Sequence, residues 1–450
     1  MGITICSGVG FLAAIGCAGL YDRKSSFLKP FVCGTVFYFF CYILWSMLLF
    51  VTNQFTLFRA VLGTAVVLVA LLTAAALLLR RKHGTLLRLL HWDESIRTVW
   101  IPLVIVLVAL PLILTKNELF GMGQDQGVYQ VVAINLMNGL TDRQQDFAEY
   151  YNLSSADQTE FADAVRNYLM GYDIVPEEYP DTVYDRNISP VSGIYHGIPT
   201  YAAMLALFGK LFGISHMIHL ETVIWVCMIF LVSFVCRQMQ WKRCTEFLAC
   251  AVCAASPIVI WVAKSSLTEL FLAVILLAFV LLITAPNRSH GLSILPVAVF
   301  ACYHVSIYTM IPLFVVLYGA LYLFRRKREY AVLMLATIPL YLASYFAMRH
   351  VQPFYTMNNY RPFFVAGISP KDLPVLVPLL CGVGLVAVGI YLCLVYFLIC
   401  RKNRDTSTEA YMQRVQHSKI AVVLVEFLLV ALVLYIGAKV LTAENPLQKL

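Results

Sequence analysis

The sequence predicts an all-α polytopic membrane protein with about twelve transmembrane helices. Of its 450 residues, 60% are hydrophobic and only 13% are charged, and the mean hydropathy is +0.78. A globular core cannot bury that much apolar surface, whereas lipid accommodates it. Apolar runs of about twenty residues recur along the chain, and basic residues gather at their ends. These observations together define the fold class.

The apolar runs divide the chain into alternating segments. They fall near residues 3–20, 31–51, 58–79, 99–115, 217–236, 245–263, 269–285, 292–303, 306–324, 330–348, 374–400 and 419–440. The stretch 292–324 is either one long helix or two short ones. Basic clusters lie near residues 23–24, 80–82, 237–243, 288, 325–328 and 401–404. If the stretch is two helices, every cluster falls on one side, which the positive-inside rule makes cytoplasmic.

Under this topology both termini and a long loop, residues 116–216, lie outside. The segments 264–269, around 304 and 349–373 share that side. Between Lys116 and Thr200 the loop holds 13 acidic and four basic residues. It has no cysteine, and the 13 cysteines sit in or beside apolar runs, so no disulfide framework or metal cluster is implied. The basic clusters form no continuous face, which excludes nucleic acid as a partner.

The outer loop carries helical patterns of its own. Residues 126–140 have apolar positions at helical spacing, with Asp125 placed to cap the start and Gly139 the end. Residues 154–170 follow the same pattern. Residues 199–212 are short and apolar, which suits a helix that lies in the membrane interface better than one that spans.

A carboxylate stands at the mouth of the fourth apolar run. Residues 123–129 read Gly-Gln-Asp-Gln-Gly-Val-Tyr. The aspartate, Asp125, is of a type that caps a helix start, and a capping carboxylate keeps a second oxygen that can face a substrate. Gly123 and Gly127 allow a backbone or ligand to approach closely. The segment is therefore a candidate for chemistry at the bilayer surface.

Together with later segments, this motif resembles the GT-C glycosyltransferases. Residues 195–201 read Tyr-His-Gly-Ile-Pro-Thr-Tyr, residues 205–213 read Leu-Ala-Leu-Phe-Gly-Lys-Leu-Phe-Gly, and residues 265–270 read Ser-Ser-Leu-Thr-Glu-Leu. Their order and spacing are similar to those of bacterial enzymes related to dolichyl-phosphate-mannose protein mannosyltransferases. The resemblance begins at about residue 99 and extends to between 350 and 373.

The resemblance implies an inverting hexosyltransferase-like enzyme that takes a sugar from a polyprenyl-phosphate donor. The acceptor would be a lipid, a glycan or a protein. An acidic residue of the first outer loop serves such enzymes as base or acceptor-orienting group, and here that position is Asp125. Glu269 is the candidate auxiliary acid, although its place at a helix start also suits the helix dipole. Family members often carry a second acid beside the aspartate, where this chain has Gln126, so metal-free catalysis is favoured and a divalent cation is left open.

The departing lipid phosphate requires cations at the outer membrane surface. The candidates on that side are Lys264, Arg349, His350 and Arg361, each of which also suits an interfacial anchor. Further candidate substrate-binding residues are Gln124, Gln126, Tyr129, His196 and His304. Glu221 and Glu426 lie in or near apolar runs, where carboxylates are costly and often functional.

These expectations divide the chain into three parts. Residues 1–98 form an N-terminal three-helix membrane module, 99–373 a GT-C-like catalytic core, and 374–450 C-terminal transmembrane helices. The expected location is a bacterial cell membrane, with the active site facing outside. Two alternatives stay open: a transporter or flippase of a lipid-linked saccharide, and a noncatalytic relative.

Overall fold

The structure is a computed structural model that describes most of the chain up to Val351. The described residues are 1–21, 28–83, 99–116, 125–139, 197–285, 290–304, 307–325 and 327–351, with short pieces between 144 and 195. They fall into two compact units. Unit 1 comprises residues 1–180, 184–305 and 347–352, and unit 2 comprises residues 181–183, 306–346 and 353–450.

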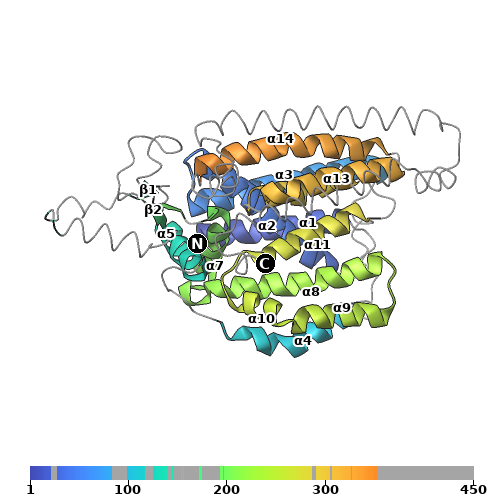
Figure 1. Ribbon diagram of the computed structural model, residues 1–450, viewed down its shortest axis with the longest axis horizontal. Coiled ribbons are helices and arrows are strands. Elements are labelled where there is room, and N and C mark those ends of the chain that lie inside the picture. The colour runs from blue at the N-terminus through green and yellow to red at the C-terminus, as the bar shows by residue number, and fades with distance from the viewer. Residues whose placement is uncertain are drawn as a thin grey trace, which may run out of the picture. The chain divides into compact units, whose positions relative to one another are not determined.

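Unit 1 contains most of the helices, and its first three belong to the same unit as those after residue 99. The helical elements of unit 1 are α-helices and two 3₁₀ segments, η4 and η5 (Figure 1). They are α1 (Gly2–Tyr21), α2 (Leu28–Val51), α3 (Leu57–His83), α4 (Trp100–Leu114), α5 (Asp125–Met137), α7 (Pro199–Phe212), η4 (Ile214–His219), α8 (Leu220–Gln238), α9 (Arg243–Ala255), α10 (Pro257–Lys264), α11 (Glu269–Ile283), η5 (His290–Ser293) and α12 (Ile294–Ala301).

Unit 2 supplies α13 (Ile307–Arg325) and the first part of α14 (Arg328–Val351). The two helices form a hairpin, and at its turn the Arg325 guanidinium donates to the Tyr330 hydroxyl at 3.0 Å. The turn after α12 separates α12 from α13, so the stretch 292–324 is two helices, the alternative that the charge pattern requires.

Ten of the twelve apolar runs fall among the described residues, and all ten are helical. The runs 374–400 and 419–440 lie outside them. Within the described part of the chain, five helices are long and apolar enough to cross a membrane: Gly2–Tyr21, Leu28–Val51, Leu57–Arg81, Ile214–Gln238 and Arg328–Val351. A sixth span results if α9 and α10 are counted as one. The mainly helical, multi-pass membrane fold is confirmed at this level.

The run 245–263 is not one helix but a pair bent by 53°. Ser256 separates α9 from α10 with an extended backbone (φ −60°, ψ 124°), and Pro257 follows at the first position of α10. Proline has no N–H and disfavours a helical conformation at the residue before it, so the chain turns here. Hydropathy could not show this break, because every residue near it is apolar or small.

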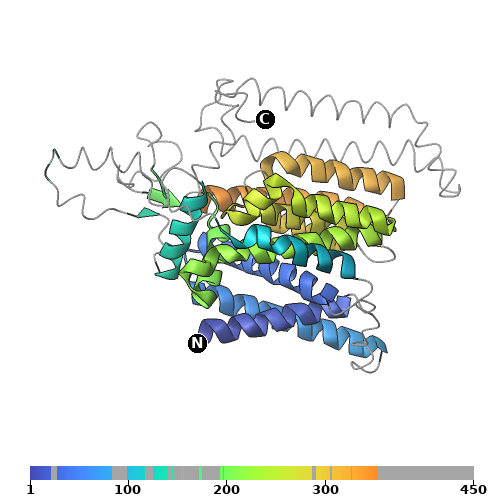
Figure 2. The same ribbon diagram turned by 90° about the horizontal axis from the view of Figure 1, so that it is seen from below.

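The helices of unit 1 place the predicted outer segments at one end. Figures 1 and 2 both show α5 and α7 at the same end of the long helices. Hydrogen bonds join that end together: Ser266, between α10 and α11, donates to the Gln126 carbonyl at 2.8 Å. Thr200 of α7 donates to the Cys302 carbonyl after α12 at 2.9 Å. Segments that the charge pattern predicts on one side therefore meet at one end of this unit.

The opposite end of α8 carries a buried ion-pair network. Glu246 of α9 is 1% exposed and accepts hydrogen bonds from Ser233 at 2.6 Å and from Arg237 at 2.8 Å. Arg243 adds a third bond at 2.9 Å. These residues belong to a cluster that the charge rule assigns to the cytoplasmic side, and the network ties α8 to α9.

The structure adds two features to the outer loop. Helix α7 has the predicted bounds, and nearly all its residues from Pro199 to Gly209 are buried, so it packs into the protein. The loop also forms a small antiparallel sheet, in the order β1 (Gln144–Gln145), β3 (Gly193–Tyr195), β2 (Tyr172–Ile174). Such short strands lack a periodic pattern and depend on pairing between distant segments. Almost all of residues 154–170 lie outside the description.

The N-terminal helices pack closely on one another and on α7. Gly34 of α2 lies against the α1 backbone, where an added Cβ would be 2.7 Å from the Cα of Ile15. The Tyr38 hydroxyl donates to Ser7 at 3.3 Å. One turn later, the buried Tyr42 donates to the Ala203 carbonyl of α7 at 3.0 Å. The first three helices thus contribute directly to the packing of the outer loop.

The close approach of α1 and α2 gives a stability test. We expect Gly34→Ala to lower the free energy of unfolding of the detergent-solubilised protein by about 1–3 kcal/mol, and its melting temperature with it, because the methyl group forces two backbones apart. Gly8→Ala, in α1, is the control, because an added Cβ there has nothing within 4 Å. Equal melting temperatures for Gly34→Ala and Gly8→Ala would contradict the packing described here.

Candidate functional site

The described part of helix α5 runs from Asp125 to Met137. Gln124 lies outside the described residues, so the prediction that Asp125 caps this helix stays a prediction. After Met137, Gly139 has φ +82°, a conformation that favours glycine and suits the predicted helix end. Asp125 is the first described residue of the helix, and the macrodipole favours a carboxylate near a helix N-terminus.

Buried glutamines of α5 join this helix to the turn between α10 and α11. The Gln130 side-chain amide donates to the Ser266 hydroxyl at 2.6 Å, and that hydroxyl donates to the Gln126 carbonyl at 2.8 Å. Ser266 is fully buried and links residues some 140 positions apart. The segments 123–129 and 265–270, which carry the GT-C resemblance, thus meet through a shared hydroxyl.

Tyr129 of α5 joins the second segment to the first. Its ring packs edge-on against that of Tyr201 in α7, with centroids 5.1 Å apart. Gly197 has φ +65°, and a Cβ at this position would lie 2.6 Å from the Tyr129 hydroxyl. Glycine is therefore required both by the backbone conformation and by the tyrosine. The segments 123–129, 195–201 and 265–270 therefore meet at α5.

A buried glutamate lies on the other side of Tyr201. Glu221, in the first turn of α8, is fully buried, and its Oε1 accepts a hydrogen bond from the Tyr201 hydroxyl at 2.7 Å. Its Oε2 has no hydrogen-bond partner within the described part of the chain. Burial, and then the charge of Glu221, raise the pKa of Tyr201 well above its usual value, so this tyrosine stays a donor.

A half-buried lysine interacts electrostatically with this glutamate. Lys116, two residues after α4, donates to the Ala263 carbonyl at 2.6 Å. Burial lowers the pKa of Lys116 to about 8, with Lys264 adding to the decrease and Glu221 opposing it. The two lysines and the glutamate are therefore electrostatic neighbours at the end of unit 1 that carries α5.

Tyr303 and Glu269 complete this polar region. The Tyr303 hydroxyl donates to the Thr268 carbonyl at 3.1 Å, and its ring lies 6.1 Å from that of Tyr201. Burial, followed by the charges of Glu221 and Glu269, raises the pKa of Tyr303 well above its usual value. Glu269 is exposed at the first position of α11. We refer below to Lys116, Tyr129, Tyr201, Glu221, Ser266 and Tyr303 as the buried polar cluster.

The structure thus brings some predicted site residues together and leaves others undescribed. Tyr129 belongs to the buried polar cluster, and Gln126, Lys264 and Glu269 contact it or interact with it electrostatically. His304 follows Tyr303 directly, and its N–H donates to the Phe300 carbonyl at 3.1 Å. Arg349 and His350 lie in the last turn of α14. Gln124, His196 and Arg361 lie outside the described residues.

Sequence reasoning did not select Lys116 or Tyr201, and it noted Glu221 without a role. Glu221 could have been found from its charge at the start of an apolar run. Its partner Tyr201 stands twenty positions earlier in another helix, and nothing in that spacing predicts the contact. In the part of the chain that the structure describes, no group of three or more metal-ligating side chains exists. A divalent cation at the Asp125 motif stays a prediction.

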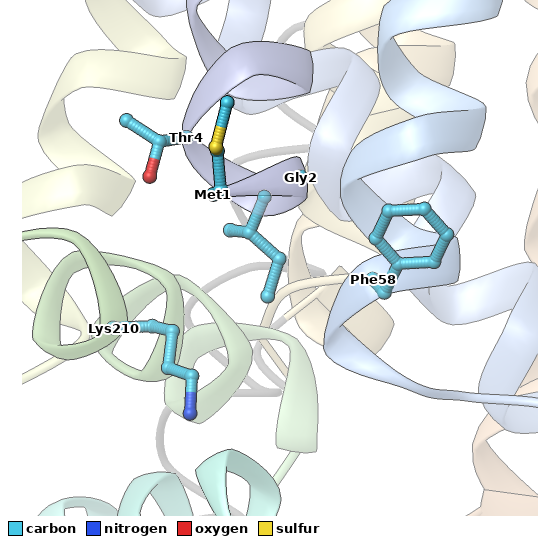
Figure 3. A pocket seen from close by; sticks show the side chains of 6 residues that line it. Met1, Gly2, Thr4, Phe58 and Lys210 are labelled. Carbon is cyan, nitrogen blue, oxygen red and sulfur yellow. The ribbon is translucent and has the colours of Figure 1, made fainter.

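A pocket elsewhere in unit 1 opens beside the chain start. It is lined by Met1, Gly2, Ile3, Thr4, Phe58 and Lys210. Figure 3 shows Lys210, from the last turn of α7, across from the first turn of α1. No residue of the buried polar cluster lines it, so this pocket is not the candidate site.

The described residues define a mainly helical, multi-pass integral membrane protein with a buried polar cluster beneath the start of α5. Comparison with protein-family models, with curated proteins and with solved structures finds no match in any of the three.

The shared hydroxyl of Ser266 gives a test of this convergence. We expect Ser266→Ala to lower the free energy of unfolding by about 1–3 kcal/mol, because the Gln126 carbonyl and the Gln130 amide lose a buried partner. Ser256→Ala is the matched control, since Ser256 makes no side-chain capping bond at its bend. Thermal melts of the detergent-solubilised variants measure the difference. A fall in melting temperature for Ser266→Ala no larger than that for Ser256→Ala would contradict the contact.

Proposed function

We propose that the protein is a GT-C type membrane glycosyltransferase. It transfers a sugar from a polyprenyl-phosphate donor to an extracytoplasmic lipid, glycan or protein acceptor, with inversion at the anomeric carbon. One observation carries the proposal: the segments 123–129, 195–201 and 265–270, whose resemblance to this family is in sequence only, converge in space through Ser266, Tyr129 and Gly197.

A second observation supports a ligand site at this end of unit 1. Eight buried side-chain atoms of the described residues lack a hydrogen-bond partner. Five of them belong to α5 and the first two turns of α8, namely Gln126 Oε1, Gln130 Oε1, Glu221 Oε2, Thr222 Oγ1 and Trp225 Nε1. Buried polar atoms are normally satisfied, so unsatisfied ones mark places where water or a ligand can bind.

The chemistry assigns a role to each residue type. Asp125 acts as the general base: it takes the proton of the acceptor hydroxyl as that oxygen bonds to the anomeric carbon. The bond from the anomeric carbon to the lipid phosphate oxygen breaks, and the lipid phosphate leaves with the electron pair. Lys264, with Arg349, His350 and Arg361 as further candidates, stabilises the departing phosphate. Glu269 orients the acceptor.

A flippase of the lipid-linked saccharide is the rival function. Translocation would require polar side chains along a path through the helices. In α8, residues 222–232 include no Asp, Glu, Lys, Arg or His. The two buried glutamates lie near opposite ends of this helix: Glu221 accepts a bond from Tyr201 at one end, and Glu246 pairs with Arg237 at the other. This separation favours chemistry at one face over movement between two. Vesicles that translocate labelled donor without transferring its sugar would favour the flippase.

The base assignment is tested by Asp125→Asn. We expect this variant to express and insert normally but to lose about 10²-fold or more of its transfer rate, because the amide cannot accept the proton. Membranes containing the protein are supplied with polyprenyl-phosphate-linked labelled hexose, and the label leaving the lipid fraction is measured. Asp173→Asn, in strand β2 of the same loop, is the control and should retain activity. Normal turnover by Asp125→Asn would sink the assignment.

A further inference from the structure

Two lysines meet where α4 and α10 end. Lys116, two residues after α4, donates to the Ala263 carbonyl of α10 at 2.6 Å. Lys264 follows Ala263 directly and is the last residue of α10. The Lys116 ammonium therefore lies against the peptide group that joins Ala263 to Lys264. Both lysines belong to segments that the charge pattern predicts on the outer side of the membrane.

The positive charge at this point is not neutralised by a salt bridge. The salt bridges between described residues are those of Glu246 with Arg237 and Arg243, and neither lysine takes part in them. An ammonium carries three N–H groups, and the Ala263 carbonyl uses one of those of Lys116. Two cations without a counter-ion in a half-buried place favour an anion as their partner.

The two ammonium groups also act on each other. Burial lowers the pKa of Lys116 to about 8, the charge of Glu221 opposes this decrease, and the charge of Lys264 adds to it. Lys116 therefore still carries its proton on most molecules at neutral pH. An anion beside both lysines would offset the repulsion between them.

Exposed apolar side chains lead to these lysines along both helices. Five large apolar side chains of α4 and α10 are more than half exposed, namely Leu107, Val108, Leu112, Ile258 and Trp261. The two helices contact each other, and Figure 1 shows them with α9 at one edge of unit 1. Leu112 is four positions before Lys116, and Trp261 is three positions before Lys264. A surface for a hydrocarbon chain therefore ends at a pair of cations.

We propose that α4 and α10 form the docking surface for a lipid phosphate. The phosphate lies between Lys116 and Lys264, which donate charge-assisted hydrogen bonds to its oxygens, and the hydrocarbon chain lies along the exposed apolar side chains of the two helices. Charge complementarity at the end of this surface selects an anionic lipid over a neutral one. That the lipid is the polyprenyl-phosphate donor rests on the proposed function, whereas the binding of a lipid phosphate does not.

Each lysine also suits a structural role. Lys116 stands at the C-terminus of α10, where a cation is favoured by the helix dipole and by the last carbonyls. Lys264 suits an interfacial anchor whose charge reaches the water. A helix cap and an anchor affect stability and insertion, but neither distinguishes a lipid with a phosphate from a lipid without one. Binding specificity therefore separates these roles from docking.

Native mass spectrometry of the full chain in detergent tests the phosphate site. The probes are polyprenyl phosphate, the polyprenol of the same chain length, and inorganic phosphate. We expect the wild type to retain the first and neither of the others at the same concentration. Lys116→Gln and Lys264→Gln should each raise the Kd for polyprenyl phosphate by about tenfold or more, because each removes a charge-assisted hydrogen bond. Lys210→Gln, in the pocket shown in Figure 3, is the matched control and should leave the Kd unchanged.

A photoactivatable polyprenyl phosphate tests where the chain lies. After crosslinking in membranes, the label should appear on peptides of α4 and α10, and unlabelled polyprenyl phosphate should compete with it. Helix α3 is the control, because it also exposes large apolar side chains such as Val66 and Leu78. Equal labelling of α3, α4 and α10 without competition is the pattern of bulk lipid and would overturn the docking surface.

The outcomes also separate this inference from the proposed function. If polyprenyl phosphate binds with the expected lysine dependence but the wild type transfers no sugar, the proposed function fails and the docking surface stands. If the wild type transfers sugar and both glutamine variants match its Kd and rate, the docking surface fails. Equal retention of polyprenol, or retention of inorganic phosphate alone, also overturns it. Thermal melts check folding, and Lys264→Gln carries the test if Lys116→Gln is unstable.

Discussion

The cost of burying polar groups in an apolar bundle is the constraint on which the rest of this structure depends. Unsatisfied polar atoms are expensive away from water, so each must find a partner wherever the helices bring one. Helix α8 (Leu220–Gln238) shows the two solutions. Near its end, Arg237 and Ser233 enclose Glu246 in a network of short bonds. At its start, Glu221 has one bond from Tyr201 and an open oxygen. The closed network is structural, and the open one marks the end of unit 1 where the candidate site lies.

That constraint explains why distant segments meet at α5 (Asp125–Met137). A helix that enters the protein from a loop brings buried amides, and Gln126 and Gln130 find their partner in Ser266. The tyrosine of the same helix packs on Tyr201, and Gly197 leaves space for its hydroxyl. The motif around Asp125 is therefore part of a buried hydrogen-bonded junction as well as a loop carrying a carboxylate. A catalytic group benefits from such support, because its position is then set by packing.

The first three helices have a place in this arrangement. Their sequence precedes the region that resembles GT-C enzymes, and we expected a module of its own. In the structure Tyr42 of α2 (Leu28–Val51) donates to a carbonyl of α7 (Pro199–Phe212), and Phe39 and Phe40 pack on Phe271 of α11 (Glu269–Ile283). The Tyr42 bond falls two residues from Tyr201. The N-terminal helices thus brace α7, the helix whose Tyr201 donates to Glu221.

The sequence by itself determined the membrane class, and it placed an apolar run on each described helix that is long enough to cross a membrane. It left open whether residues 292–324 form one helix or two. Hydropathy and the distribution of lysine and arginine are local properties, and both survive folding unchanged. It also singled out Asp125 and the three segments around it. Only the tertiary structure decided what those segments touch. The pairings Tyr201–Glu221, Ser266–Gln130 and Tyr42–Ala203 join residues 20, 136 and 161 positions apart, and no periodicity encodes such contacts. Packing between helices also decided the burial of α7 and the interaction of Lys116 with Glu221. The sequence pattern of a single segment carries no information about such packing.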